Sequence, residues 1–166
     1  MILVDANLLL YAKFSDFPQH GPAAEWLQQV LSERSRVGLP WHSLLAFIRI
    51  GTSARVFSRP LPMADALEQV NEWLGLPGVW VPAPTDQHAT VLGKLLLEAN
   101  AAGNLVSDAH LAALSLEHGL EICSADADYA RFPGVRWHNP LTGATAGVRE
   151  RSARYRARRI SGRTRS

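Results

Sequence analysis

Short apolar runs alternate along the chain with longer segments that are apolar on one face. The runs at residues 2–4, 79–81 and 121–123 have the length and composition of buried strands, and runs at 37–40 and 135–137 predict two further strands. Between them, apolar residues recur at helical spacing, which predicts helices over residues 8–12, 23–33, 44–56, 64–74, 86–99 and 105–118. Strands that alternate with helices favour right-handed βαβ crossovers. The pattern therefore predicts an α/β fold, a three-layer α/β/α sandwich with a central parallel sheet of four to five strands.

Capping residues mark several of these boundaries. The predicted caps are Ser43 before the helix at 44–56, Thr85 or Asp86 before the helix at 86–99, and Gly119 after the helix at 105–118. The pair Asn139-Pro140 predicts the end of the fold, so residues 1–140 are expected to form one domain.

Composition restricts the class of protein. A chain of 166 residues with 47% hydrophobic content suits one globular domain. The single cysteine, Cys123, rules out an intrachain disulfide and a Cys-based zinc site. No run approaches the roughly 20 apolar residues of a membrane span, and the apolar start is too short for a signal peptide. We therefore expect a cytoplasmic protein that does not contact a membrane.

Charge is distributed very unevenly between the two ends of the chain. Eight arginines and one glutamate follow Val148, which gives this end a net charge of +7 and leaves −5 for residues 1–148. Residues 141–166 are therefore expected to form a basic, Arg-rich tail with too few apolar residues to pack, and hence to be disordered. An acidic body that acted on a polyanion would need metal ions or local basic groups.

Carboxylates from three segments are predicted to reach the same edge of the sheet. Asp5 ends the first strand, Asp126 and Asp128 directly follow the strand at 121–123, and Asp108 lies near the start of a helix rich in Leu and Ala. Ligands of open α/β sheets bind at the carboxyl ends of the strands. Clustered acids repel one another unless a cation lies among them, and oxygen ligands suit Mg²⁺ or Mn²⁺ rather than zinc. The convergence predicts a divalent metal site.

Each of these acids also has a purely structural interpretation. Asp5 is equally compatible with capping the helix that begins near Asn7. Asp108 is compatible with a favourable interaction with the helix dipole, and Ser124 with Asp126 is typical of a strand-to-helix turn. The metal-site hypothesis depends on the coincidence of all three.

The segments around these acids resemble those of PIN-domain ribonucleases of the VapC toxin type. The matching stretches, in the same order and spacing, are Val4-Asp5-Ala6-Asn7, Asn104 to Leu111, and Ser124 to Tyr129 followed by Arg131-Phe132. The resemblance covers residues 1–140 and implies a PIN-like sandwich. In that family the positions of Asp5, Asp108 and Asp126 hold a divalent metal, Mg²⁺ or Mn²⁺. The resemblance also implies an endoribonuclease that cleaves RNA, a cognate VapB-type antitoxin partner and a homodimer.

One position departs from the family pattern. The family often has a glutamate on the helix at 44–56, and here the corresponding residue is Ala46, although Phe47 and Arg49 match. This departure puts a four-carboxylate, two-metal site in doubt. Asp128 is the nearest residue that could supply the missing oxygen, directly or through water.

Several polar residues have supporting roles in this hypothesis. Asn7 is expected to orient Asp5 or a metal-bound water, and Ser124 to do the same for Asp126; helix capping is the alternative for Asn7. Arg49 could touch phosphate or hold Asp5, and a salt bridge on the helix face is the alternative. His110 is interpreted as a residue at the rim of the site, and the other histidines show no constellation.

The sequence leaves three functional hypotheses. The first is a Mg²⁺- or Mn²⁺-dependent endoribonuclease with Asp5, Asp108, Asp126 and Asp128 as catalytic residues. The second, suggested by Ala46, is a catalytically degenerate PIN domain that binds RNA or a protein partner. The third is a phosphatase that forms an aspartyl-phosphate on Asp5. It ranks last because that chemistry usually needs an acid at position 7, which is Asn.

Overall fold

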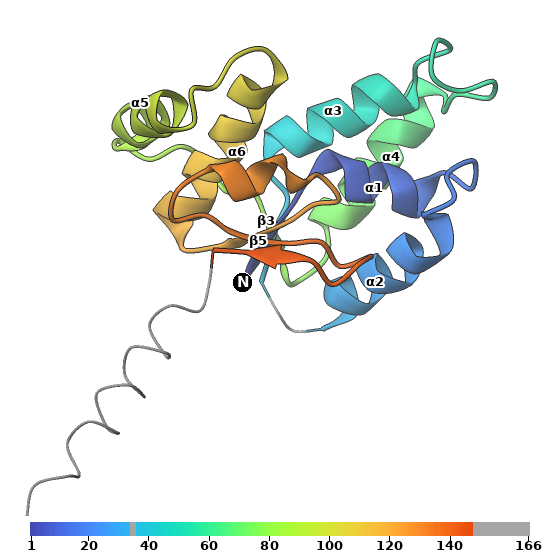
Figure 1. Ribbon diagram of the computed structural model, residues 1–166. Coiled ribbons are helices and arrows are strands. Elements are labelled where there is room, and N and C mark those ends of the chain that lie inside the picture. Colours follow the sequence, from blue (N-terminus) through green and yellow to red (C-terminus); the bar gives the residue numbers. More distant parts are fainter. Residues whose placement is uncertain (34–35, 148–166) are drawn as a thin grey trace, which may run out of the picture.

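The computed structural model describes residues 1–33 and 36–147. Its helices are α1 (Ala6–Lys13), α2 (His20–Ser32), α3 (Trp41–Gly51), α4 (Met63–Leu74), α5 (His88–Glu98) and α6 (Asn104–His118), with a short 3-10 helix η1 (Ala127–Arg131). The strands are β1 (Ile2–Val4), β2 (Val37–Gly38), β3 (Val79–Trp80), β4 (Glu121–Cys123), β5 (Arg136–His138) and β6 (Thr145–Ala146), all in one sheet (Figure 1). The arginines after Val148 lie outside the described residues, and so does most of the predicted disordered tail.

The sheet has the strand order β3-β2-β1-β4-β5-β6. The first five strands in this order are parallel, which confirms the predicted parallel sheet. A sixth strand, β6, pairs antiparallel with β5 and was not predicted. The sheet therefore continues beyond Asn139-Pro140, where the sequence predicted that the fold would end. Asn139 instead begins the turn to β6, because its side chain accepts a hydrogen bond from the backbone N–H of Leu141 at 2.9 Å.

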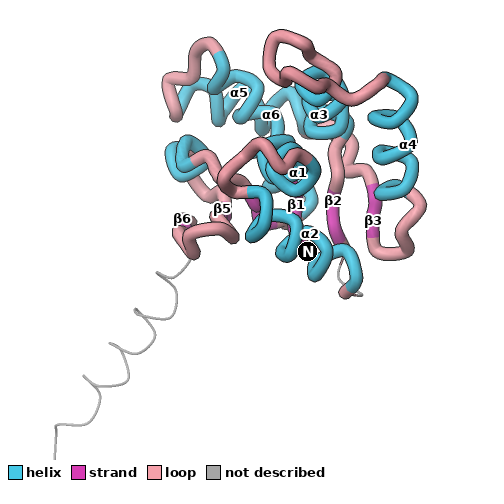
Figure 2. Tube along the Cα trace, turned by 90° about the vertical axis from the view of Figure 1, so that its right-hand side faces the viewer, coloured by secondary structure: helices cyan, strands magenta, loops and turns pink. Residues whose placement is uncertain are grey.

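Strand β1 divides the hydrophobic core in two, because consecutive strand residues point to opposite faces of a sheet. Leu3 packs with Ile122 of β4 and with apolar residues of α6, whereas Val4 packs with Cys123 and apolar residues of α1. Helices α5 and α6 thus cover one face, and α1 to α4 contribute to the core on the other. Figure 2 shows α1 and α2 in front of the strands. The predicted three-layer sandwich is confirmed.

Helix α3 begins and ends earlier than the sequence predicted. Its N-cap is Pro40, whose fixed φ of −68° and extended ψ of 149° start the helix at Trp41 without a side-chain capping bond. The prediction of Ser43 as the N-cap is wrong, because Ser43 lies within the first turn of α3 and is fully buried. The helix ends at Gly51.

The ends of α5 and α6 differ in how well they were predicted. Helix α5 starts at His88 after Gln87, and neither Thr85 nor Asp86 caps it. The Thr85 hydroxyl instead accepts a hydrogen bond from the N–H of Gln87 at 3.2 Å in the preceding turn. Gly119 ends α6 in the left-handed region at φ 64°, as predicted.

The chain contains no candidate for a membrane-spanning helix among residues 1–33 and 36–147. None of the helices described there is both long and apolar enough to cross a bilayer.

Candidate active site at the carboxyl edge of the sheet

The parallel topology places the predicted carboxylates at one edge of the sheet. Asp5 directly follows β1 and Asp126 follows its neighbour β4, and the backbone N–H of Asp5 donates to the carbonyl of Cys123 at 3.0 Å. Asp108 comes from the second turn of α6, which packs against β4 and η1. Carboxylate oxygens of Asp108 and Asp126 lie within 4.8 Å of each other, and the charge of Asp5 raises the pKa of Asp108.

Asp5 is both a helix cap and part of this cluster. Its Oδ1 accepts a hydrogen bond from the N–H of Ala6 at 2.7 Å, which makes it the N-cap of α1. Its Oδ2 accepts from Nδ2 of Asn7 at 3.0 Å and from the hydroxyl of Ser124 at 2.7 Å. The two interpretations of Asp5 from the sequence are therefore compatible, since the capping oxygen and the other oxygen have different partners.

Asn7 and Ser124 join the loops that follow β1 and β4. The Ser124 hydroxyl accepts from Nδ2 of Asn7 at 2.9 Å and from the N–H of Asp126 at 3.0 Å, and Oδ1 of Asn7 accepts from the N–H of Ala125 at 3.2 Å. Ser124 is fully buried, so the bonds that its hydroxyl makes are shielded from bulk water. This arrangement agrees with the orienting roles expected for Asn7 and Ser124.

The structure groups the oxygens of Asp108, Asp126 and Asp128 most tightly. One carboxylate oxygen from each lies within 4.8 Å of the other two, an arrangement that could hold a metal ion. The N–H of Asp128 donates to Oδ1 of Asp126 at 2.9 Å, which fixes the turn that brings both acids to the same side. Asp5 lies outside this closest group and forms the half-buried base of the site. Asp128 thus lies close enough to Asp108 and Asp126 to offer a further oxygen to the same metal ion.

Burial and mutual repulsion disturb the titration of the two least exposed acids. Burial, followed by the charges of Asp5, Asp126 and Asp128, raises the pKa of Asp108 from 3.8 to about 6. Burial also raises the pKa of Asp5, although the bonds from Ser124 and Ala6 and the charge of His42 act in the opposite direction. A cation among these carboxylates would remove the repulsion that raises the pKa of Asp108.

The raised pKa of Asp108 predicts a pH-dependent stability of the metal-free protein. The folded state retains a proton on Asp108 up to about pH 6, whereas the unfolded state loses it near 3.8. The favourable contribution of this protonation is complete below the unfolded pKa, and it is lost as the pH rises through about 6. We expect the melting temperature in EDTA to fall as the pH rises from about 5 to about 7.5. Mn²⁺ should raise the melting temperature more at about pH 7.5 than at about pH 5, and an equal rise at the two pH values would contradict this prediction.

Tyr129 is a component of the site that the sequence analysis did not assign. It follows Asp128 in η1 and is fully buried, and its hydroxyl meets hydrogen-bond geometry with no described residue. Burial and the negative charges of Asp5 and Asp108 raise the pKa of this phenol well above 10. The hydroxyl nevertheless acts as a hydrogen-bond donor toward Asp5 and Asp108 and lowers the pKa of both carboxyls, so a buried, protonated hydroxyl faces the carboxylates. Its position directly after Asp128 is the only signal that the sequence offered.

The residues of α3 that were compared with the family pattern lie as follows. Ala46 is half-buried and offers no oxygen. Arg49 is exposed and forms no ion pair in the described part of the chain, and the donors that hold Asp5 are Ala6, Asn7 and Ser124. The structure thus shows neither a salt bridge of Arg49 on the helix face nor a contact between Arg49 and Asp5.

The expectation that the histidines show no constellation is wrong. Nε2 of His88 lies 2.9 Å from Nδ1 of His110, and the ring centroid of His42 lies 5.5 Å from that of His110. These residues are far apart in sequence and come from α5, α6 and α3 respectively, so no local spacing could reveal the cluster.

Comparison with known proteins gives consistent results. A family model described as PIN domain matches residues 2–135. Ribonuclease VapC37 of Mycobacterium tuberculosis is 46% identical over 140 residues, which cover 84% of this chain and 97% of that protein. Ribonuclease VapC33 of the same species is 43% identical over 141 residues, which cover 85% of this chain and 99% of that protein.

Solved structures with low sequence identity share the fold. The VapBC2 structure from Rickettsia felis, bound to a DNA fragment from its promoter, contains a chain with a TM-score of 0.62 and 14% identity. The match covers 84% of this chain and 98% of that chain. The FitAB structure bound to an IR36 DNA fragment has a TM-score of 0.58 and 18% identity, covering 85% and 96%.

Proposed function

The chain belongs to the PIN-domain family and is a relative of the VapC ribonucleases, and from this premise we propose that it is the toxin of a type II toxin–antitoxin system. Its activity in this proposal is endonucleolytic hydrolysis of RNA, assisted by Mg²⁺ or Mn²⁺. The observation that carries the proposal is the convergence of Asp108, Asp126 and Asp128 within 4.8 Å beside the half-buried Asp5.

The donor set fits a hard divalent cation. All ligand atoms available in the cluster of Asp108, Asp126 and Asp128 are carboxylate oxygens, which suit Mg²⁺ or Mn²⁺ better than zinc. The buried hydroxyl of Tyr129 also supports the fit, because it is a donor directed at Asp5 and Asp108, and such a donor orients a carboxylate for a cation. Asp5, Asp108 and Asp126 are the proposed ligands, with Asp128 as a further oxygen donor.

In phosphodiester hydrolysis, some protein groups would hold the metal ligands in place and others would exclude bulk water. A bound divalent cation would lower the pKa of a water that attacks phosphorus and would neutralise the non-bridging and leaving oxygens. Ser124 and Asn7 fix Asp5 and the loop that carries Asp126. The full burial of Tyr129 keeps bulk water from the base of the site. The expected products carry a 5′-phosphate and a 3′-hydroxyl.

Cleavage of a structured RNA by the purified chain tests this proposal directly. We expect hydrolysis in Mg²⁺ or Mn²⁺, loss of hydrolysis in EDTA, and recovery when the metal is restored. Product ends are identified by labelling with a kinase before and after phosphatase treatment. RNA cleavage that continues in EDTA would show that the carboxylate cluster is not the catalytic centre.

A second candidate function is favoured by Ala46. Since this half-buried residue supplies no carboxylate, the domain could be a degenerate PIN fold that binds RNA or a protein without cleaving RNA. Calorimetry with Mn²⁺ separates the two candidates. The absence of binding at millimolar Mn²⁺ would favour the binding module, whereas binding that disappears in Asp108→Asn would favour the nuclease.

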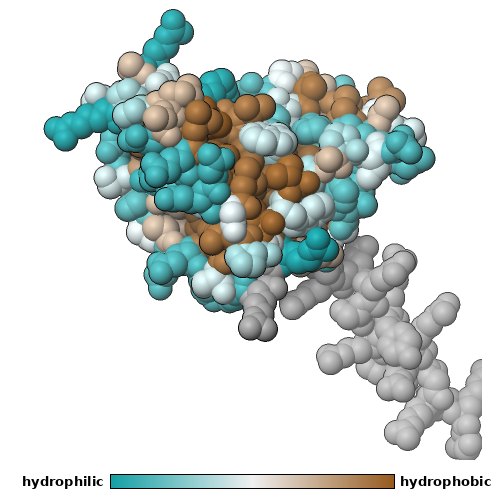
Figure 3. Space-filling model, turned by 180° about the vertical axis from the view of Figure 1, so that it is seen from behind, coloured by the Kyte–Doolittle hydropathy of each residue, from teal (hydrophilic) through white to brown (hydrophobic). Residues whose placement is uncertain are grey.

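The proposed antitoxin has a suitable surface on α3 and α4. Trp41 and Leu45 are 51% and 58% exposed one turn apart on α3, and Met63 and Leu67 are 53% and 47% exposed one turn apart on the neighbouring α4. Figure 3 shows that apolar side chains gather on the back of the molecule, the side on which α4 and β3 lie in Figure 2. Because similar solved structures are VapBC2 and FitAB, we propose a VapB-type antitoxin segment as the occupant.

Leu45→Glu should weaken antitoxin binding about 10- to 100-fold, because it introduces a charge into an apolar contact. The matched control is Leu97→Glu on α5, where the wild-type side chain is 84% exposed on a different helix. Calorimetry with the cognate antitoxin and RNA cleavage by the free toxin are the measurements. Equal antitoxin affinity of the Leu45→Glu variant and the control would place the contact elsewhere.

A further inference from the structure

A partly buried series of hydrogen bonds joins α5 to α6 close to Asp108 in the sequence. Nδ1 of His88, at the start of α5, is 2.6 Å from Oε2 of Glu117 on α6, and Nε2 of His88 is 2.9 Å from Nδ1 of His110. The side chains of Glu117 and His88 are only 2% and 14% exposed. These hydrogen bonds therefore lead from the carboxylate of Glu117, through His88, to the imidazole of His110, which is two residues from Asp108 in the sequence.

The buried carboxylate of Glu117 is well satisfied. Besides His88, it accepts hydrogen bonds from the N–H of Thr85 at 3.1 Å and from the Thr85 hydroxyl. Burial alone would raise the pKa of Glu117, but the bonds from His88 and Thr85 outweigh it, so the pKa is lowered. Glu117 is thus ionised near neutral pH and can only accept hydrogen bonds.

The ionised carboxylate fixes the direction of the first bond. Nδ1 of His88 must donate to Glu117, because an ionised carboxylate can only accept. The other ring nitrogen of His88, Nε2, shares a hydrogen bond with Nδ1 of His110 at 2.9 Å. His88 thus links Glu117 to His110 and holds the imidazole of His110 in one orientation, with Nε2 of His110 on the side of the ring away from His88.

The topology places these imidazoles next to the acids on the same edge. The carboxyl ends of β2 and β3 lead to His42 and His88, and those of β1 and β4 lead to Asp5 and Asp126. The rings of His42 and His110 are 5.5 Å apart, and the charge of His42 acts on Asp5. The edge thus presents carboxylates over its centre and imidazoles over one flank.

We propose that His42 and His110 contact backbone phosphates of the RNA strand on the flank of the site, and that Glu117 and His88 are positioning residues that hold His110. This inference rests on the proposed function, since it assumes that RNA crosses the carboxylate cluster. Residues 1–148 have a net charge of −5, so the strand needs N–H donors beside the acids. An imidazole already fixed by hydrogen bonds loses less conformational entropy on binding than a free side chain.

Binding of a fluorescent RNA hairpin in EDTA, measured by anisotropy, tests this inference without hydrolysis. RNA binding should weaken about tenfold in each of the single variants His110→Ala, His88→Gln and Glu117→Gln. The double variant with His88→Gln and Glu117→Gln should lose no more RNA affinity than either single variant. The matched control is His118→Gln, on the same helix, whose wild-type Nε2 bonds only to the carbonyl of Ala83 at 2.8 Å. Mn²⁺ affinity should remain unchanged in His88→Gln and Glu117→Gln.

The hydrogen bonds from Glu117 through His88 to His110 could instead merely tie α5 to α6. The melting temperature and the RNA affinity together separate these two roles. If Glu117→Gln lowers the melting temperature but binds RNA like the wild type, or if the wild type binds no RNA, the inference is wrong. RNA binding that depends on these histidines, without metal-dependent cleavage, would refute only the proposed nuclease activity. RNA cleavage that is insensitive to these histidines would refute only the proposed contact of His42 and His110 with RNA phosphates.

Discussion

Asp108→Asn should lower the rate of RNA hydrolysis at least about 100-fold while the chain remains folded. Loss of residues that merely support metal ligands typically costs 10- to 100-fold, and Asp108 is a proposed ligand itself. The neutral amide also removes one charge from a cluster in which burial and three acids raise the pKa of Asp108 to about 6. The metal-free variant should therefore melt at a higher temperature than the wild type at pH 7.5, because the repulsion is reduced.

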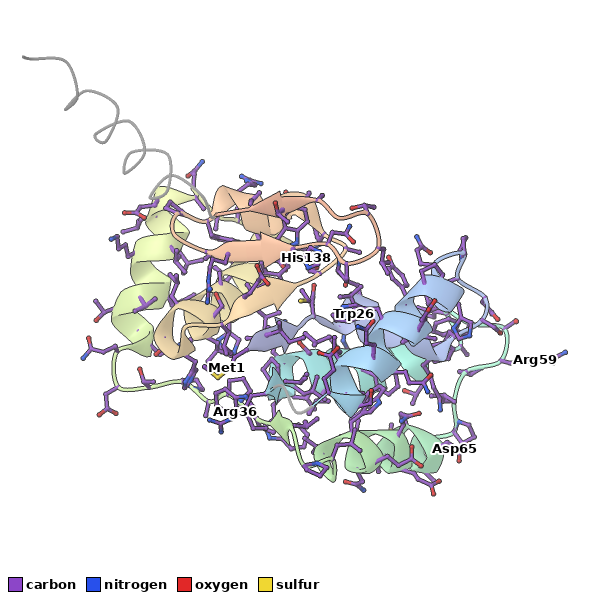
Figure 4. The ribbon with its side chains drawn as sticks, turned by 90° about the horizontal axis from the view of Figure 1, so that it is seen from below. Met1, Trp26, Arg36, Arg59, Asp65 and His138 are labelled. Carbon is purple, nitrogen blue, oxygen red and sulfur yellow. The ribbon has the colours of Figure 1, made fainter. Side chains whose placement is uncertain are left out.

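The control for this variant is Asp65→Asn. Asp65 is an exposed acid in the first turn of α4, and it points away from the body of the molecule in Figure 4. Removal of its charge changes the net charge by the same amount without touching the site. Measured kcat/KM in Mn²⁺ should be unchanged in the control. An active Asp108→Asn variant would show that the site is assigned to the wrong carboxylates.

The fold and the centre of the site could be predicted because both depend on local patterns. Strand length, helical spacing and their alternation lead to a parallel sheet, and a parallel sheet brings the residues after β1 and β4 to one edge. Asp5 and Asp126 are such residues. Asp108 could be predicted because a carboxylate near the start of a nearly apolar helix is costly to bury unless it has a partner.

The parts of the site that the sequence did not indicate depend on contacts between distant segments. The bond from Asp128 to Asp126 is local, but the burial of Tyr129 depends on how η1 packs on α6. The bonds from His88 to Glu117 and His110 require the packing of α5 on α6. No spacing rule within one segment could have indicated the burial of Tyr129 or the bonds of His88.

Helix starts show a similar limit on a smaller scale. Ser43 has the chemistry of an N-cap, but Pro40 starts α3 first because its backbone is already fixed for that position. The Ser43 side chain is then carried into the buried side of the helix. A residue's chemical preference for a cap is thus overridden by a nearby residue with a stronger backbone constraint.

Ser124→Ala is expected to reduce RNA hydrolysis about 10- to 100-fold and to lower the free energy of unfolding by about 1–3 kcal/mol. The Ser124 hydroxyl donates to Asp5 and accepts from Asn7 and from the N–H of Asp126, so its removal deprives three groups of a hydrogen bond made at a fully buried hydroxyl. Loss of the bond to Asp5 should raise the pKa of Asp5 further. Loss of the bond to Asp126 should loosen the turn that brings Asp126 and Asp128 together.

These two effects of Ser124→Ala can be separated by measurement. Urea unfolding gives the change in stability, and calorimetry with Mn²⁺ gives the change in metal affinity. Ser32→Ala is the control, because the Ser32 hydroxyl makes one exposed hydrogen bond to the carbonyl of Gln29 at the end of α2. If Ser124→Ala lost stability but retained wild-type Mn²⁺ affinity and kcat/KM, Ser124 would serve the fold alone. If both fell together, the bonds that join the loops after β1 and β4 would be required to present Asp5 and Asp126 to the metal.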